Sequence, residues 1–154
     1  MGVLLRNDHP KINIDSLYIE GKILKVMDAL DCHNHEVSIL FTGDPEIQKL
    51  NLEFRGIDHP TDVLSFPQEE GPSLPRAIIL GDVVVSLDTA QAQAKEHELS
   101  LHEEITLLLI HGILHLLGYD HEISELEDKK MRVKTRELFN LVFPGKVLTD
   151  SCNY

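Results

Sequence analysis

Three histidines in the stretch 111–121 have the spacing of a metal site. His111 and His115 are four residues apart, so on an α-helix their imidazoles lie on one face, about one turn apart. Gly118 follows where such a helix would end, because glycine enters the left-handed conformation without steric cost. The chain can then turn back so that His121 approaches the same point. Three neutral imidazoles around one Zn²⁺ leave a fourth position open for water, as in catalytic zinc sites.

The interval His-x-x-x-His-x-x-Gly-x-x-His resembles the motif of the metzincin zinc peptidases, in which a glutamate directly follows the first histidine. Here that position is Gly112. The peptidase glutamate takes the proton from the zinc-bound water, so its absence argues against peptide hydrolysis and leaves the metal site intact. Zinc lowers the pKa of its water to about 7 and can polarise a phosphoryl oxygen. Asp120 fits a turn residue or a partner of a ligating imidazole better than a ligand.

Arg55 is followed by a group of polar side chains at Asp58, Thr61, Asp62 and Ser65. Taken alone, an arginine at the end of a helix is usually a solvated terminal residue. Next to these polar side chains, its guanidinium can hold a phosphate with two parallel hydrogen bonds and neutralise charge that develops during phosphoryl transfer. We therefore expect Arg55, Thr61 and Ser65 to bind substrate.

The net charge opposes a broad nucleic-acid-binding surface, which is usually basic. Fourteen lysines and arginines stand against 26 aspartates and glutamates, which gives a formal charge of −12. A local cationic cleft remains compatible with this charge, because only groups within a Debye length of about 8 to 10 Å act on a phosphate.

Cysteine usage and hydropathy favour the cytoplasm. Cys32 and Cys152 form no C-x-x-C pair, and a chain of 154 residues does not need a disulfide framework. No stretch approaches the roughly 20 apolar residues that span a bilayer, and the apolar N-terminal stretch is too short for a signal peptide. We expect a cytoplasmic protein that does not bind a membrane.

The length and the hydrophobic pattern predict a single α+β domain over residues 1–154, with four strands and five helices. The expected strands cover residues 10–14, 37–42, 63–66 and 77–85, and a loop covers 68–76. The expected helices cover about 17–30, 44–54, 87–98, a long segment that starts with the capping box at Ser100 and carries the first two histidines, and 123–140.

Several side chains are expected at definite places within these elements. The long helix is apolar all round from 105 to 110 and should be central to the core. Asp82 is conspicuous in an otherwise aliphatic strand, where it is either a structural carboxylate or one that orients a ligating histidine or Arg55. Residues expected to face inward from the last helix are Ile123, Leu126, Val133, Leu138 and Phe139. Histidines that lack ligand spacing and are expected at the surface are His9, His33, His35, His59, His97 and His102.

The full run from His111 to His121, His-Gly-x-Leu-His-Leu-x-Gly-Tyr-Asp-His, resembles the signature of the YbeY family. That family consists of single-strand-specific endoribonucleases that act in ribosomal RNA maturation and ribosome quality control. Three further stretches, 51–58, 61–67 and 80–86, resemble the family in the same order. The resemblance thus spans most of the chain.

The resemblance implies an α+β sandwich with a mixed sheet of about four strands, related to the metzincin core, and one zinc ion per chain. His111, His115 and His121 match the family's metal ligands, and Arg55 matches its functionally required arginine beside the metal. The implied role is processing of the 3′ end of the small-subunit RNA and removal of defective ribosomes. The implied partners are single-stranded ribosomal RNA and a ribosomal protein or a ribosome-associated GTPase.

The leading hypothesis is a zinc-dependent endoribonuclease with Arg55 and His115 as its catalytic residues. The metal or its water would activate the scissile phosphate while Arg55 clamps it, although a ribose 2′-hydroxyl could be the nucleophile instead. One alternative is a zinc-stabilised, non-catalytic ribosome assembly factor. The other is a metallopeptidase or amidase, against which Gly112 argues.

Overall fold

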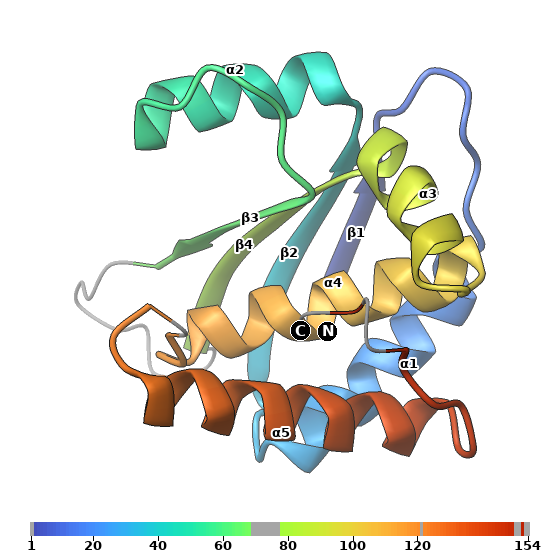
Figure 1. The fold of residues 1–154 in the computed structure, drawn as a ribbon, viewed down its shortest axis with the longest axis vertical. Coiled ribbons are helices and arrows are strands. Elements are labelled where there is room, and N and C mark those ends of the chain that lie inside the picture. Colours follow the sequence, from blue (N-terminus) through green and yellow to red (C-terminus); the bar gives the residue numbers. More distant parts are fainter. Residues whose placement is uncertain (1, 69–77, 121, 150–151, 153–154) are drawn as a thin grey trace.

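The computed structural model describes residues 2–68, 78–120, 122–149 and 152 of the chain. Five helices and four strands follow one another in these described residues (Figure 1). They are β1 (Val3–Asn7), α1 (Ser16–Ala29), β2 (His35–Thr42), α2 (Asp44–Arg55), β3 (Val63–Pro67), β4 (Ile78–Ser86), α3 (Leu87–Glu96), α4 (Leu101–Leu116) and α5 (Glu125–Val142).

The four strands form one mixed sheet in the order β1-β2-β4-β3. β1, β2 and β4 are parallel, as expected where helices connect successive strands, and β3 runs antiparallel to β4 at the edge. The expected α+β architecture with a four-stranded mixed sheet is therefore confirmed.

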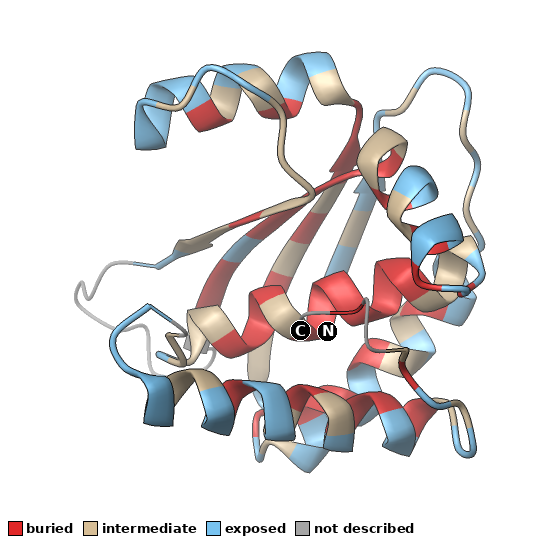
Figure 2. Cartoon of the chain, in the orientation of Figure 1, coloured by how far each residue is buried: buried red, intermediate tan, exposed pale blue. Residues whose placement is uncertain are grey.

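The helices form layers on the two faces of the sheet (Figure 1). α1 and α4 cover one face, and α5 packs on the outer side of these two helices. α2 covers part of the other face, where Ile47 meets Leu64 and Val84. Figure 2 shows that burial is concentrated in the strands and in α4, so α4 is the central helix of the molecule.

α4 begins at the expected capping box. The Ser100 hydroxyl accepts from the Glu103 backbone N–H, and the Glu103 carboxylate accepts from the Ser100 N–H. Every residue from Ile105 to Ile110 is buried, because the sheet lies on one side of the helix and α5 on the other.

No single helix in the described part of the chain is long and apolar enough to cross a membrane. α3 and α4 reach that length and hydropathy only when taken together, and the two helices are bent by 109° relative to each other.

The strand expected over residues 10–14 is wrong, and the first strand is β1, which ends at Asn7. The imidazole of His9 explains the difference, because its Nδ1 atom accepts hydrogen bonds from the backbone N–H groups of Lys11 and Ile12. Because these two N–H groups bond to a side chain, they are not used for hydrogen bonds to a neighbouring strand.

The inward face predicted for the last helix is partly wrong. Leu138 and Phe139 are buried, but Ile123, Leu126 and Val133 are exposed. The residues that α5 buries are Met131, Thr135, Leu138, Phe139 and Val142. These residues also recur at helical spacing, but they lie on a different face of the helix from the one expected. The elements that pack against α5 determine which face is buried.

Candidate metal centre

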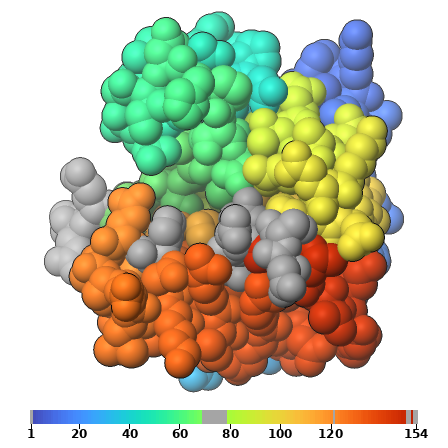
Figure 3. Space-filling view, viewed as in Figure 1, coloured from blue at the N-terminus to red at the C-terminus, as the bar shows by residue number. Residues whose placement is uncertain are grey.

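A cleft of about 820 Å³ opens beside α4. Its walls come from the end of α2 and the loop that follows, from β3, and from the beginning of α5. Figure 3 shows its surroundings from one face, with α2 in turquoise to green, the following loop in green and α5 in orange to red. The lining residues are Arg55, Thr61, Asp62, Val63, Leu64, Ser65, Pro67, His111, His115, Asp120, Glu122, Asp128, Met131 and Arg132.

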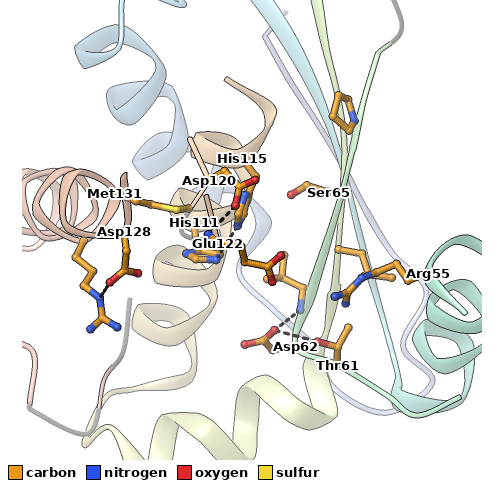
Figure 4. Close-up of a pocket in the computed structure, with 14 residues that line it drawn as sticks. Arg55, Thr61, Asp62, Ser65, His111, His115, Asp120, Glu122, Asp128 and Met131 are labelled. Atoms are coloured by element: carbon orange, nitrogen blue, oxygen red, sulfur yellow. Dashed lines mark hydrogen bonds and ion pairs between the residues drawn. The ribbon is translucent and has the colours of Figure 1, made fainter. Parts of the chain in front are cut away.

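The imidazoles of His111 and His115 converge within this cleft (Figure 4). Their Nε2 atoms lie 3.1 Å apart, and their rings meet edge to face at 81°. Two nitrogens bound to one tetrahedral zinc at about 2.0 to 2.1 Å would lie about 3.3 Å from each other. The pair therefore fits two ligands of one metal ion.

The third expected ligand, His121, lies outside the described residues. Within the described ranges no group of three or more His, Cys, Asp or Glu side chains is arranged to hold a metal, so these ranges supply two of the three expected ligands. The turn that would lead to the third expected ligand is described as far as Asp120. Gly118 has a φ of 97°, and its N–H donates to the His115 carbonyl. Asp120 accepts from the Glu122 N–H at 2.8 Å, as the turn residue that was expected.

Gly112 allows α4 to approach the sheet. A Cβ atom at this position would lie 2.8 Å from Val83 Cγ1 and 3.1 Å from Ser65 Oγ. The Ser65 hydroxyl also donates to the Gly112 carbonyl at 3.0 Å. A glutamate here would collide with the sheet, so the absence of the peptidase base is built into the packing of this helix.

Arg55 enters the cleft from the end of α2, opposite the α5 side chains Asp128 and Met131 (Figure 4). Gly56 ends the helix in the left-handed region at a φ of 71°, which no residue with a Cβ adopts readily. The chain then returns towards β3. Thr61 donates to the carboxylate of Asp62, which also accepts from the Val63 N–H at 2.7 Å.

The structure thus brings the described candidate residues into one cleft: Arg55, Thr61, Ser65, His111 and His115. Asp82 is elsewhere. It is exposed on the sheet face opposite α4 and lines a separate groove with Leu4 and Phe54, so it does not orient an imidazole of the cleft. The sequence did not single out Arg132 and Glu122 as cleft residues, because no local spacing shows that α5 folds back against α4.

A buried ionisable pair joins α3 to α4, and its carboxylate lies about two turns before His111 on α4. Glu104 is fully buried, and its Oε1 atom is 2.5 Å from His97 Nδ1 at the end of α3. Burial raises the pKa of Glu104, the hydrogen bond to His97 opposes this, and the nearby Asp62 carboxylate adds to the rise. The expectation that His97 is a surface residue is wrong.

Comparisons with known proteins identify the family of the chain. The family described as Endoribonuclease YbeY matches residues 5–142. The chain belongs to the YbeY family. All four stretches that resemble YbeY proteins lie within the matched region, and the resemblance drawn from them is confirmed.

Several YbeY relatives are similar over most of their length. The chain is 46% identical over 137 residues to the endoribonuclease YbeY of Persephonella marina, covering 89% of this chain and 90% of the relative. It is 52% identical over 130 residues to that of Aquifex aeolicus, covering 84% of each. The solution structure of TM1509 from Thermotoga maritima is similar with a TM-score of 0.63 at 28% identity, covering 94% of this chain and 99% of that one.

Proposed function

We propose that the chain is a zinc-dependent endoribonuclease that cuts single-stranded ribosomal RNA, with His111, His115 and His121 as zinc ligands. The endoribonuclease class follows from membership of the YbeY family. The observation that carries the proposal is the convergence of two imidazole Nε2 atoms, 3.1 Å apart, in the same cleft as Arg55.

When bound, zinc supplies a Lewis acid and an activated water. The residues of the chain bind and orient the RNA around it. Arg55 donates one Nη1 hydrogen bond to Asn51, and among the described residues its guanidinium makes no other hydrogen bond, so its other N–H donors can bind a phosphate. Ser65 gives its hydroxyl proton to the Gly112 carbonyl, so towards the RNA it acts as an acceptor. A ribose hydroxyl is an RNA group that such an acceptor can bind.

The nucleophile in this cleft could be water or the ribose 2′-hydroxyl. Because Gly112 stands where the peptidases have their glutamate base, no base next to the first histidine favours one nucleophile over the other. Attack by the 2′-hydroxyl leaves a 2′,3′-cyclic phosphate, whereas attack by water leaves a linear phosphate monoester. Mass spectrometry of the cleaved RNA ends distinguishes the two.

The cellular role that we propose is maturation of the 3′ end of small-subunit ribosomal RNA and quality control of ribosomes, in the cytoplasm. A ribosomal protein or a ribosome-associated GTPase is the proposed protein partner. Family resemblance supports this role, since YbeY relatives carry the name endoribonuclease. The charge of −12 is a further reason for a partner, which would deliver a polyanionic substrate to an acidic protein.

The test combines elemental analysis of the purified protein with cleavage of single-stranded RNA before and after chelation. We expect about one zinc per chain and loss of cleavage on chelation. His115→Ala should lose both metal and cleavage. Arg55→Ala should keep the metal and lose cleavage by about 10² to 10³-fold, the usual effect of removing a group that stabilises transition-state charge.

Two matched variants control for the loss of a histidine or an arginine as such. His33→Ala removes an exposed histidine, and Arg6→Ala removes an exposed arginine paired with Asp8. Both should leave metal content and cleavage unchanged. Metal without cleavage in every preparation would favour the assembly factor, and a protein that binds no metal would overturn the proposal.

A further inference from the structure

Asn51 is a fully buried polar residue on α2. Its side-chain amide makes two hydrogen bonds: Oδ1 accepts from Arg55 Nη1 at 3.2 Å, and Nδ2 donates to the His59 carbonyl at 2.9 Å. Its backbone carbonyl accepts from the Ile57 N–H at 3.3 Å. One residue therefore binds the arginine side chain and two points of the loop that follows.

The chemistry of its partners fixes the orientation of this amide. A backbone carbonyl can only accept, so the NH₂ group of Asn51 must face His59. A guanidinium can only donate, so the carbonyl oxygen of the amide must face Arg55. Because each partner has a single role, the amide cannot be turned over without losing both bonds.

We propose that Asn51 is a positioning residue that holds the Arg55 guanidinium in the cleft; the inference rests on the proposed role of Arg55. Arg55 is itself exposed at the end of a helix, and an arginine side chain has about 2 kcal/mol of rotamer entropy to lose when it is ordered. An acceptor held rigidly in the core orders that side chain before RNA binds. Preorganised charge of this kind is what a phosphoryl-transfer site requires.

Asn51→Leu is the informative variant. Leucine has the same branching and number of side-chain heavy atoms as asparagine but removes both hydrogen bonds. The carbonyl it releases belongs to the exposed His59, where water can replace the donor. Gln48→Ala is the matched control on the same helix. Gln48 donates to Asp58 at 3.0 Å, so its loss also loosens the loop, but it makes no contact with Arg55 among the described hydrogen bonds.

The test is a double-mutant cycle on the full chain, loaded with zinc, that measures kcat and KM for single-stranded RNA. We expect Asn51→Leu to reduce kcat/KM at least tenfold when Arg55 is present. The loss should be divided between kcat and KM as it is in Arg55→Ala. In the Arg55→Ala background it should cause no further loss, and Gln48→Ala should stay within about twofold of wild type. An equal loss in both backgrounds would mean that Asn51 only supports the fold and would overturn the inference.

A second measurement does not depend on activity. The Arg55 Nε–H signal in ¹⁵N NMR, identified by its disappearance in Arg55→Ala, should have a high order parameter in the wild type and a low one in Asn51→Leu. If Arg55→Ala cleaves RNA normally, the proposed role of Arg55 fails, and the NMR result still decides whether Asn51 orders it. An unchanged order parameter in Asn51→Leu would overturn the positioning role. Thermal unfolding of each variant verifies that it is folded.

Discussion

At Gly112 the backbone of α4 lies so close to the sheet that a single added carbon would come within 2.8 Å of Val83 Cγ1. Val83 is buried and β-branched, so it has little freedom to move aside. A side chain on the residue after the first histidine would therefore strain the packing of α4 against β3 and β4, so glycine is favoured there. At this position, packing and chemistry select the same residue.

Gly112→Ala should lower the free energy of unfolding by about 1 to 2 kcal/mol, because overpacking outweighs the higher helix propensity of alanine. Gly21→Ala is the matched control, since Gly21 lies within α1 with no atom within 4 Å of an added Cβ. It should raise the free energy of unfolding by about 0.5 to 1 kcal/mol. Urea unfolding measures both, and equal stabilisation by the two substitutions would contradict the close approach of α4 to the sheet.

The contact between α3 and α4 contains the His97 and Glu104 pair, which couples two helices through a buried carboxyl group. Because burial raises the pKa of Glu104 above its usual 4.5, the folded chain holds that proton more tightly than the unfolded chain. The resulting contribution to stability is fully present below pH 4.5 and is lost as the pH rises through the raised pKa. The buried Glu104 carboxyl therefore favours folding most in acid.

Glu104→Gln should remove this pH dependence. We expect the free energy of unfolding of the wild type, relative to the variant, to fall as the pH rises above about 4.5 towards neutrality. Glu53→Gln, an exposed position on α2, makes the same change in net charge without touching the pair. Denaturant unfolding at a series of pH values gives the three curves. A Glu104→Gln curve that stays parallel to the wild-type curve would contradict the buried, proton-holding carboxyl.

Elements whose signals are local could be predicted from the sequence. The capping box at Ser100 and Glu103, the apolar run that follows and the glycine after the helix depend only on neighbouring residues, so α4 was expected where it is found. The two imidazoles share a face of that helix because of their spacing alone. The placement of the first two proposed ligands therefore needed no tertiary information.

Features decided by distant partners could not be predicted in this way. His9 was expected at the surface, but its side chain is 6% exposed, because it bonds to Asp88, 79 residues away, at 2.8 Å. The buried stripe of α5 was misplaced for the same reason, since α1 and α4 decide which side chains are covered. The composition of the cleft also depends on α5 folding back, so Arg132 had no signal in the sequence.

The charge distribution of the whole molecule limits how it can hold RNA. The formal charge is −12, and the cleft itself combines two arginines with four carboxylates. The arginines are Arg55 and Arg132, and the carboxylates are Asp62, Asp120, Glu122 and Asp128. Arg132 is already paired with Asp128 at 2.9 Å. Few cations are therefore available to displace counterions from the RNA, and the surface outside the cleft repels it.

The affinity for single-stranded RNA should consequently depend only weakly on salt. Each phosphate contact with a single strand changes log K by about 0.7 per decade of salt. Because Arg132 is already paired with Asp128, Arg55 alone predicts a slope of about −0.7. Arg55→Ala should make the slope shallower by about 0.7, while Arg6→Ala, an exposed arginine that does not line the cleft, should leave it unchanged. Fluorescence anisotropy of a labelled oligonucleotide, titrated at several monovalent salt concentrations with cleavage blocked by chelation, measures these slopes. A wild-type slope of −4 or steeper would mean that RNA contacts a broad basic surface outside the cleft, which the net charge argues against.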